Sequence, residues 1–305
     1  MTSIDALRRS KAALLLDGSM GQELLTRGVR DDPVLWSAHV MDDNVAAVTD
    51  LHREYLHAGA DIITTNTYST NWNRFKDNGG RHRFETLNHR AGEAAQNAIQ
   101  GIDRPAFVAA SLPPMRDSYV PQNVLPFQQM LEEYGPQAEI LSDYADVFLC
   151  ETMSSGEEGL AAATAASEFA KGKPIWVSWT TQDEGTGLLR SGETIQAAAA
   201  LLESVDVSGH LVNCSIPEAI TEAVPKLMST NADFHGAYGN GFESIPDTRR
   251  KGFGEDQLAE RADLGPTAYR EYAQRWLDQG VDLIGGCCLI GPAHIAALWE
   301  LIEGR

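Results

Sequence analysis

The chain has few basic residues and no long apolar run. Its 305 residues include 24 Lys and Arg against 43 Asp and Glu, which gives a formal net charge of −19 at pH 7. Such a charge repels phosphate backbones and anionic lipid headgroups. No segment approaches the ~18 apolar residues of a membrane span, and no apolar stretch of signal-peptide length follows the charged segment 1–9. We expect a soluble, cytoplasmic protein that binds neither nucleic acid nor membrane.

Cysteine is also scarce. The chain has four cysteines, too few for a disulfide scaffold of this length. Two of them, Cys287 and Cys288, are neighbours, and adjacent cysteines are poorly placed to form a bridge with each other. We therefore expect reduced thiols, which are available as metal ligands.

The glycine-rich phosphate turn of dinucleotide-binding sheets is missing, since segment 17–21 after the first apolar run lacks G-x-G-x-x-G. The chain instead has eight short apolar, β-branched runs, separated in most places by amphipathic helical patterns. They are 13–17, 61–65, 106–111, 146–151, 174–179, 210–214, 233–238 and 282–286. Eight parallel strands close a barrel of about 250 residues. We predict one α/β domain over 1–305, a (β/α)8 TIM barrel with its active site at the C-terminal mouth, in preference to an open sheet.

The connections are helical in most places, with one long exception. Apolar periodicity predicts helices over 45–59, 161–171 and 267–280. Segment 239–265, after the seventh run, is polar, charged and glycine-containing. A loop of that length in a compact domain is usually functional or mobile. A lid over the barrel mouth and a solvated excursion are the two interpretations that remain open.

Three of the four cysteines follow predicted strands at the same end of the barrel. Cys214 closes the sixth run, and Cys287 and Cys288 close the eighth. Adjacent strand residues point to opposite faces, so this pair can reach one ion only where the strand breaks up, which the two preceding glycines permit. Three thiolates with a fourth position open are typical of catalytic zinc. We predict Zn²⁺ on these three cysteines, the alternative being small core residues, and a core position for Cys150.

Eight short segments match the pattern of a known family. They are 15–21, 35–38, 58–61, 64–68, 150–152, 189–193, 212–215 and 285–288. In these segments the chain resembles the homocysteine S-methyltransferase family, which includes betaine-, S-methylmethionine- and cobalamin-dependent enzymes, over nearly its whole length. Gly-Gly-Cys-Cys at 285–288 with Asn213-Cys214 upstream is the most specific match. The resemblance implies a (β/α)8 barrel with zinc on Cys214, Cys287 and Cys288. The sequence 289–292, Leu-Ile-Gly-Pro, departs from the family's usual continuation, which bears on the methyl donor and not on the metal.

The chemistry of such a site suits methyl transfer to a thiol. A free thiol has a pKa of about 8.5, and only its thiolate is a good nucleophile. Zinc would hold the homocysteine sulfur in the open position, ionised and in line with the donor methyl. We predict zinc-dependent methyl transfer from a sulfonium donor, S-methylmethionine first and S-adenosylmethionine second, to homocysteine, which forms methionine.

Several alternatives stay open at this point. One is a betaine- or corrinoid-dependent thiol or selenol methyltransferase of the same family. Only a short segment follows Cys288, so a corrinoid would be expected to arrive on another protein. A zinc hydrolase on the same barrel is disfavoured, because three thiolates leave the metal less acidic than histidine-rich sites do. A noncatalytic metal- or thiol-binding protein would need the cysteines but no substrate carboxylates.

The amino acid end of homocysteine needs an anion for its ammonium and donors for its carboxylate. Glu151, at the end of the fourth run, is the first candidate for the anion, and Asp17 is the second. The family resemblance supports Asp17, Gly18 and Glu151 as substrate contacts, and more weakly Asn66. Both Asp17 and Asn66 also suit an ordinary turn.

A sulfonium or quaternary ammonium donor favours aromatic faces. Trp36, Tyr68, Trp72 and Trp179 lie near predicted strand ends or in loops on the mouth side. For each of them alone, core packing is the favoured interpretation.

Overall fold

The strands of this protein form a closed parallel barrel. The computed structural model describes residues 3–245 and 258–305. The strands are β1 (Leu14–Leu15), β2 (Ile62–Thr64), β3 (Phe107–Leu112), β4 (Val147–Met153), β5 (Ile175–Trp179), β6 (Gly209–Asn213), β7 (Phe234–Gly239) and β8 (Leu283–Gly286). Their order is β1-β8-β7-β6-β5-β4-β3-β2, and a parallel bridge from Leu16 to Ile62 joins β1 to β2. The predicted (β/α)8 barrel is confirmed, and each strand overlaps its predicted run.

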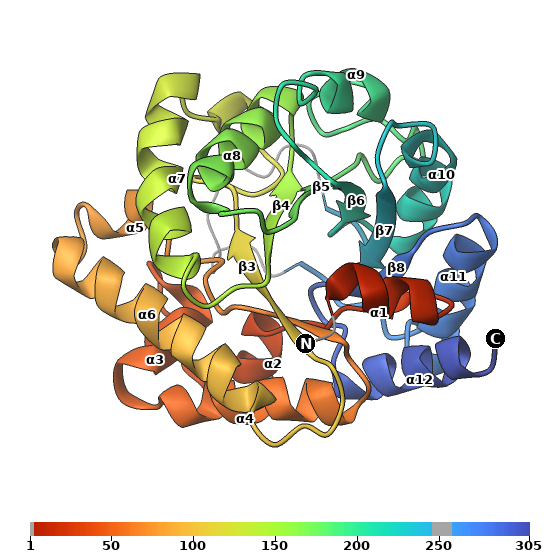
Figure 1. Ribbon diagram of the computed structural model, residues 1–305, viewed down its shortest axis with the longest axis horizontal. Helices are drawn as coiled ribbons and strands as arrows, with labels where there is room; N and C mark the ends of the chain where they lie inside the picture. Colours follow the sequence, from red (N-terminus) through yellow and green to blue (C-terminus); the bar gives the residue numbers. More distant parts are fainter. Residues whose placement is uncertain (1–2, 246–257) are drawn as a thin grey trace.

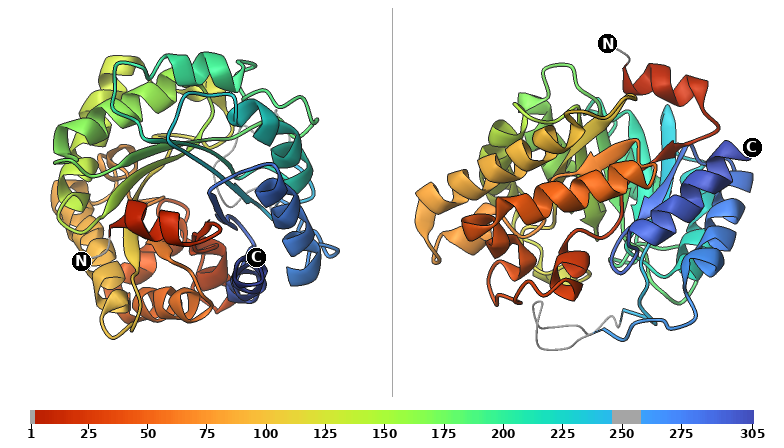
Figure 2. Two further views of the ribbon diagram at one scale, coloured as in Figure 1. Left: turned by 45° about the vertical axis from the view of Figure 1, so that its right-hand side comes forward. Right: turned by 90° about the horizontal axis from the view of Figure 1, so that it is seen from below.

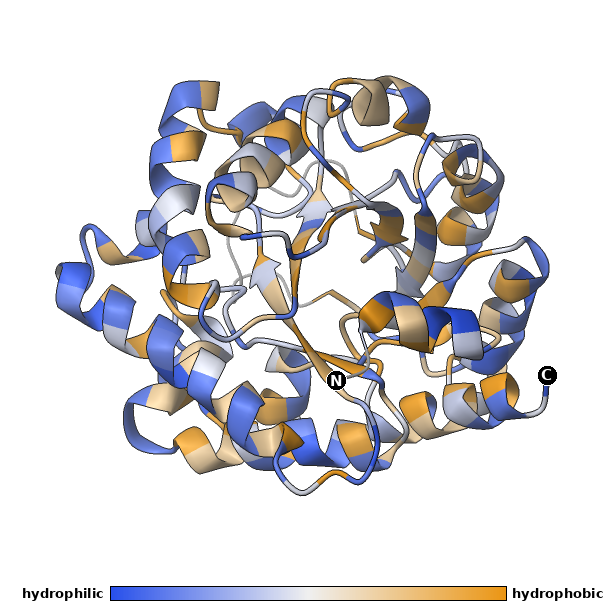
Figure 3. Ribbon diagram, viewed as in Figure 1, coloured by the Kyte–Doolittle hydropathy of each residue, from blue (hydrophilic) through white to orange (hydrophobic). Residues whose placement is uncertain are grey.

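Helices surround the barrel (Figures 1 and 2). Those that connect successive strands or follow the last one include α4 (Val45–His57), α6 (Gly80–Ile99), α7 (Phe127–Leu141), α8 (Gly156–Phe169), α9 (Ile195–Ala200), α10 (Pro217–Leu227), α11 (Pro266–Asp278) and α12 (Pro292–Glu303). Shorter elements are α1 (Ile4–Ser10), α2 (Gly21–Thr26), η1 (Trp36–His39), α3 (Val40–Asp43), α5 (Trp72–Phe75) and η2 (Pro121–Asn123). Hydrophobic residues recur along one side of these helices, and polar residues lie on the outer surface (Figure 3).

The helices differ from the predicted ones at several boundaries, and two of these differences have local reasons that the structure shows. Helix α8 begins at Gly156, ahead of the predicted start at 161, because the Ser155 hydroxyl accepts a hydrogen bond from the Glu158 amide and caps the helix. Helix α4 ends at His57, since Gly59 adopts a left-handed φ of 110° that ends the helical turn.

Side-chain alternation along the strands builds two cores. In β4, Phe148 and Cys150 pack between the sheet and the helices, whereas Val147 and Leu149 lie in the barrel interior. The predicted core position of Cys150 is confirmed. Because alternate residues share a face, the same register places Glu151 on the inner side at the carboxyl end of the strand.

Helix α1 lies across the amino ends of the strands, in front of the barrel in Figure 1. Ile4 packs into the interior cluster, and Arg8 bonds the Asp233 carbonyl and the Asp282 carboxylate, which precede β7 and β8. The opposite, carboxyl end of the barrel is therefore the end at which loops form the site.

The two described ends of segment 239–265 pair with each other at this carboxyl end. Phe242 and Glu260 form an antiparallel bridge, and the Gly241 amide donates to the Cys288 carbonyl at 2.9 Å. The interpretation of this segment as a lid depends largely on 246–257, which lie outside the described residues. Across 3–245 and 258–305, no helix is both long enough and apolar enough to cross a bilayer.

Candidate functional site

A pocket opens at the carboxyl ends of β1 to β4 and β6 to β8. The residues predicted for the site all line it: Asp17, Gly18, Asn66, Glu151, Cys214, Cys287 and Cys288. They come from loops and strand ends that are far apart in the sequence. The structure therefore brings the predicted thiols and the predicted substrate contacts into one pocket.

The three cysteines converge at one side of this pocket. Their sulfur atoms all lie within 4.8 Å of one another, and the Sγ atoms of Cys214 and Cys288 are 3.7 Å apart. Strand β8 ends at Gly286, and the Ile290 amide then donates to the Cys287 carbonyl to form a turn. Both cysteines thus lie just beyond the regular strand, as their shared site requires. Among the described residues, no other trio of His, Cys, Asp or Glu side chains is grouped in this way.

Cys214 itself has an unusual backbone. Its φ is +48°, in the left-handed region that non-glycine residues rarely adopt. Its amide donates to the Tyr238 carbonyl at 3.1 Å, so pairing with β7 holds this conformation in place. Strain of this kind costs about 1–3 kcal/mol and is concentrated at functional sites.

The pKa values of the three thiols diverge because the thiols are hydrogen-bonded to one another. Burial alone would raise the pKa of Cys214, but hydrogen bonds from Cys287, Cys288 and Tyr119 outweigh it, and that pKa lies well below its ordinary value. The hydrogen bonds to Cys214 raise the pKa values of Cys287 and Cys288 well above theirs. Without a cation, one of the three thiols therefore ionises readily and two resist ionisation. Three thiolates this close together require a soft cation among them, and the donor set fits such an ion.

Two buried carboxyl groups face the same pocket. Burial raises the pKa of Glu151 to about 7, although a hydrogen bond from the Ser111 hydroxyl at 2.5 Å lowers it. Burial also raises the pKa of Asp17 to about 8, against hydrogen bonds from the amide and hydroxyl of Thr64, both at 2.8 Å. The charge of Glu151 further raises the pKa of Asp17, and the charge of Cys214 further raises the pKa of Glu151. A cationic ligand group would stabilise both ionised forms.

Asn66 and Gly18 are placed differently within the pocket. The Asn66 amide nitrogen is buried and has no hydrogen-bond partner, which leaves a donor for a ligand, since a buried polar group without a partner is costly. At Gly18, a Cβ atom would lie 2.0 Å from the Ile290 carbonyl oxygen. The glycine is therefore required for close packing against the turn that follows the cysteine pair.

Four further residues support the site, and the sequence analysis assigned a role to none of them. The Tyr119 hydroxyl, from the loop after β3, lies 3.0 Å from Cys214 Sγ. Tyr238 donates to Glu151 at 3.3 Å, and Ser111 contacts the other oxygen of that carboxylate. The Asn213 side chain accepts from the Thr152 amide at 3.0 Å. Asn213, which directly precedes Cys214, is thus bonded to the residue that directly follows Glu151. Its place beside Cys214 in the most specific motif was the one available signal.

The four aromatic residues named from the sequence divide into two groups. Trp36 and Tyr68 line the cavity. Trp72 instead packs edge-on against Phe84, with ring centroids 5.6 Å apart, and Trp179 is fully buried. Core packing is therefore the role of Trp72 and Trp179, whereas Trp36 and Tyr68 form part of the pocket wall.

Comparison with known proteins identifies the family. A family model described as homocysteine S-methyltransferase matches residues 14–302. The chain belongs to this family. The predicted family and the predicted enzyme class, a methyltransferase, are confirmed.

The match extends along whole chains of individual relatives. Homocysteine S-methyltransferase 2 of Arabidopsis thaliana is 25% identical, over 99% of this chain and 96% of its own length. Selenocysteine Se-methyltransferase of Brassica oleracea var. italica is also 25% identical, over 99% and 92%. The crystal structure of the metallated form of the homocysteine methyltransferase MmuM from Escherichia coli superposes with a TM-score of 0.82 at 26% identity, covering 97% of this chain and 98% of that one.

Proposed function

We propose that this methyltransferase moves a methyl group from a sulfonium donor to the sulfur of homocysteine, forming methionine, and that Cys214, Cys287 and Cys288 hold the zinc ion it requires. The observation that carries this proposal is the group of three cysteine sulfurs within 4.8 Å, beside two buried carboxyl groups in one pocket. An acceptor with a thiol and an ammonium group matches this pocket, because the thiol suits a metal on the cysteines and the ammonium suits the carboxyl groups.

The donor set favours zinc over other common metals. Soft thiolate ligands select zinc or copper(I) over the hard cations that prefer oxygen ligands, and three protein ligands are typical of a catalytic zinc site. When bound, zinc supplies the Lewis acidity that keeps a thiol ionised at neutral pH. The metallated state of the Escherichia coli relative agrees with a metal in this family.

The remaining pocket residues would bind the amino acid part of homocysteine. The Glu151 carboxylate is the first partner of the substrate ammonium, and the Asp17 carboxylate is the second. Asn66 offers its unpartnered amide nitrogen to the substrate carboxylate. Gly18 lets the loop after β1 approach closely, because no side chain intervenes between it and the turn at Ile290. These contacts fix the acceptor so that its sulfur points at the donor methyl.

The cavity walls favour a cationic methyl donor. Trp36, Tyr68, Tyr119 and Tyr238 all line the pocket, and a sulfonium centre is attracted to aromatic faces. We place S-methylmethionine first and S-adenosylmethionine second. Betaine, whose quaternary ammonium would also suit these faces, and a corrinoid are the alternative donors.

A selenol is a second candidate acceptor. The Brassica oleracea relative is named a selenocysteine Se-methyltransferase and aligns over 99% of this chain. A selenolate is softer than a thiolate and suits the same soft cation. By contrast, a zinc hydrolase is disfavoured, because none of the described residues that line the pocket is a histidine.

The test is methionine formation by the purified protein from homocysteine with each donor in turn. We expect the highest kcat/KM with S-methylmethionine, a lower one with S-adenosylmethionine, and little turnover with betaine. Selenocysteine in place of homocysteine tests the second acceptor. Turnover with betaine alone would overturn the sulfonium assignment, and zinc-loaded protein that is inactive with every donor would overturn the proposed reaction.

A further inference from the structure

An ion pair with largely buried side chains lies beside the cysteine cluster and outside the substrate pocket. Asp183 and Arg190 both belong to the loop between β5 and α9, and their side chains are 6% and 0% exposed. Arg190 Nη2 and Asp183 Oδ1 are 3.0 Å apart. A buried ion pair is weak evidence for stability, since desolvation of the two charges offsets much of their attraction. Its contacts show what it holds in place instead.

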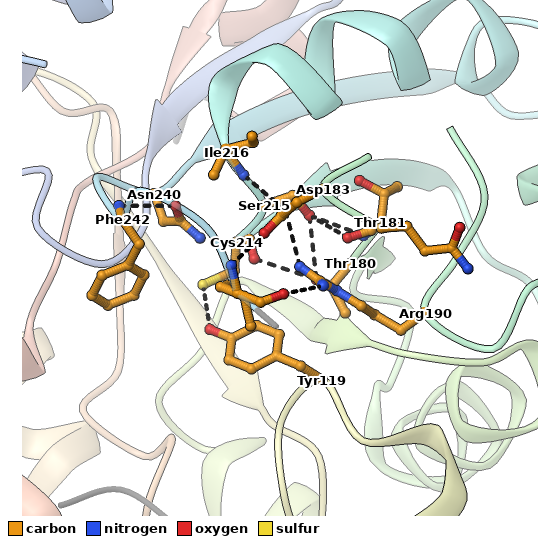
Figure 4. A network of polar contacts seen from close by, with 12 residues as sticks. Tyr119, Thr180, Thr181, Asp183, Arg190, Cys214, Ser215, Ile216, Asn240 and Phe242 are labelled. Carbon is orange, nitrogen blue, oxygen red and sulfur yellow. Dashed lines mark hydrogen bonds and ion pairs between the residues drawn. The ribbon is translucent and has the colours of Figure 1, made fainter. Parts of the chain in front are cut away.

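One set of contacts leads to Cys214 (Figure 4). The guanidinium carbon of Arg190 lies 5.5 Å from the centre of the Tyr119 ring, and the Tyr119 hydroxyl lies 3.0 Å from Cys214 Sγ. Asp183 Oδ1 also accepts from the amide of Ile216 at 3.4 Å, two residues beyond Cys214. The ion pair is therefore linked to Cys214 indirectly, through Tyr119 on the side-chain side and through Ile216 on the backbone side.

A second set of contacts leads to an apolar cluster that packs around the thiols. Asp183 Oδ2 accepts from the Ile245 amide at 2.5 Å, and Arg190 Nη1 donates to the Ile245 carbonyl at 2.9 Å. Both backbone groups of Ile245 are thus held by the two members of the pair. Ile245 and Phe242 pack in one apolar cluster with Cys214, with Cys287 and Cys288 against it.

We propose that Asp183 and Arg190 are positioning residues for the metal site. The pair fixes the Cys214 sulfur through Tyr119 and Ile216, and it holds Ile245 in the apolar cluster that buries this sulfur. Neither residue touches the reacting atoms. This inference rests on the proposed metal-binding role of the cysteines. It extends that role to a loop from which no ligand comes.

Variants of Arg190 test this inference at the metal centre itself. Arg190→Lys keeps the charge but loses the planar fork that serves Asp183 and Ile245 together, and Arg190→Met removes the charge as well. We would measure the rate of zinc release to a chromogenic chelator and the visible spectrum of the cobalt-substituted protein. Outer contacts of metal ligands typically change metal affinity by about 10- to 100-fold. We expect release to accelerate in that range for Arg190→Met and less for Arg190→Lys, with altered cobalt bands in both.

The matched control is a buried ion pair at the other end of the barrel. Lys11 and Asp61 are 2.8 Å apart, with side chains 17% and 4% exposed, and they precede β1 and β2. Lys11→Met should cost stability but leave zinc release and the cobalt spectrum as in the wild type. If Arg190→Met does not fold, Arg190→Lys and Asp183→Asn decide the question. Wild-type release rates and spectra in the Arg190 variants, or equal changes in Lys11→Met, would overturn the inference alone. Wild-type protein that binds no zinc would overturn the proposed function with it.

Discussion

Replacement of Cys287 by alanine is expected to abolish both tight zinc binding and methyl transfer. The free energy of zinc binding to sites with four protein ligands is about 10–16 kcal/mol at pH 7. One of only three ligands therefore accounts for several kcal/mol of the binding free energy. We therefore expect zinc affinity to fall by at least roughly 10³-fold, and kcat/KM to fall with it. Elemental analysis after dialysis, with methionine formation on the same sample, measures both quantities.

Cys150→Ala is the matched control for this variant. Cys150 is also buried, but it packs between the sheet and the helices and lies outside the cysteine cluster. Its loss should lower stability by about 1 kcal/mol, the cost of a small core cavity, and leave zinc content at one per chain. Equal loss of zinc in the two variants would mean that Cys287→Ala loses zinc because its folding is disturbed. Zinc retained in Cys287→Ala would contradict the ligand assignment.

The second large effect is expected from Glu151→Gln. Loss of the anion that faces the substrate ammonium breaks a buried charge pair, which typically costs about 2–5 kcal/mol, or roughly 30- to 4,000-fold in kcat/KM for homocysteine. Zinc content should stay unchanged, because Glu151 is not part of the cysteine group. Kinetics at saturating donor, together with zinc analysis, separate substrate binding from metal loss.

The control here is Glu158→Gln. Glu158 is a buried carboxyl at the start of α8 whose pKa is also raised to about 7 by burial, and it accepts hydrogen bonds from Ser154. It does not line the pocket. A comparable loss of kcat/KM in Glu158→Gln would show that removal of any buried carboxylate charge disturbs the fold, and the substrate role of Glu151 would then fail.

The raised pKa of Glu151 also predicts a pH dependence with a definite sign. Below about pH 7 the carboxyl of the free enzyme keeps its proton and is neutral, because burial disfavours the ionised form. It must lose that proton to pair with the ammonium, so homocysteine affinity should rise as the pH increases through about 7. In Glu151→Gln the part of this dependence that is due to Glu151 should disappear, while the contributions of the substrate thiol and of Asp17, whose pKa burial raises to about 8, remain. Parallel pH profiles of kcat/KM for the two would contradict the assignment.

Much of the fold was predictable because its signals are local. Each barrel strand is a short apolar run without polar alternation, because both of its faces are buried, as Phe148 and Leu149 show in β4. The cysteines were predictable as a group because parallel strands end at the same rim. The helix boundaries were predicted less accurately, because they depend on single capping residues such as Ser155 at α8.

The contacts that support the site were not predictable from the sequence. Tyr119 reaches Cys214 across 95 positions of sequence, and Asn213 reaches Thr152 across 61. The Arg190 segment was recognised as part of the family pattern, yet nothing in it indicated that its guanidinium would clamp the backbone of Ile245. Such contacts depend on how the loops of a closed barrel meet, which local periodicity does not determine.

According to the proposed function, three cysteines hold a zinc ion without which homocysteine is not methylated. Removal of the metal with a chelator, followed by readdition of zinc in substoichiometric steps, tests it most directly. Methionine formation should vanish in the metal-free protein and return in proportion to the zinc bound, with saturation at one zinc per chain. Full activity of protein shown by elemental analysis to be metal-free would contradict the account.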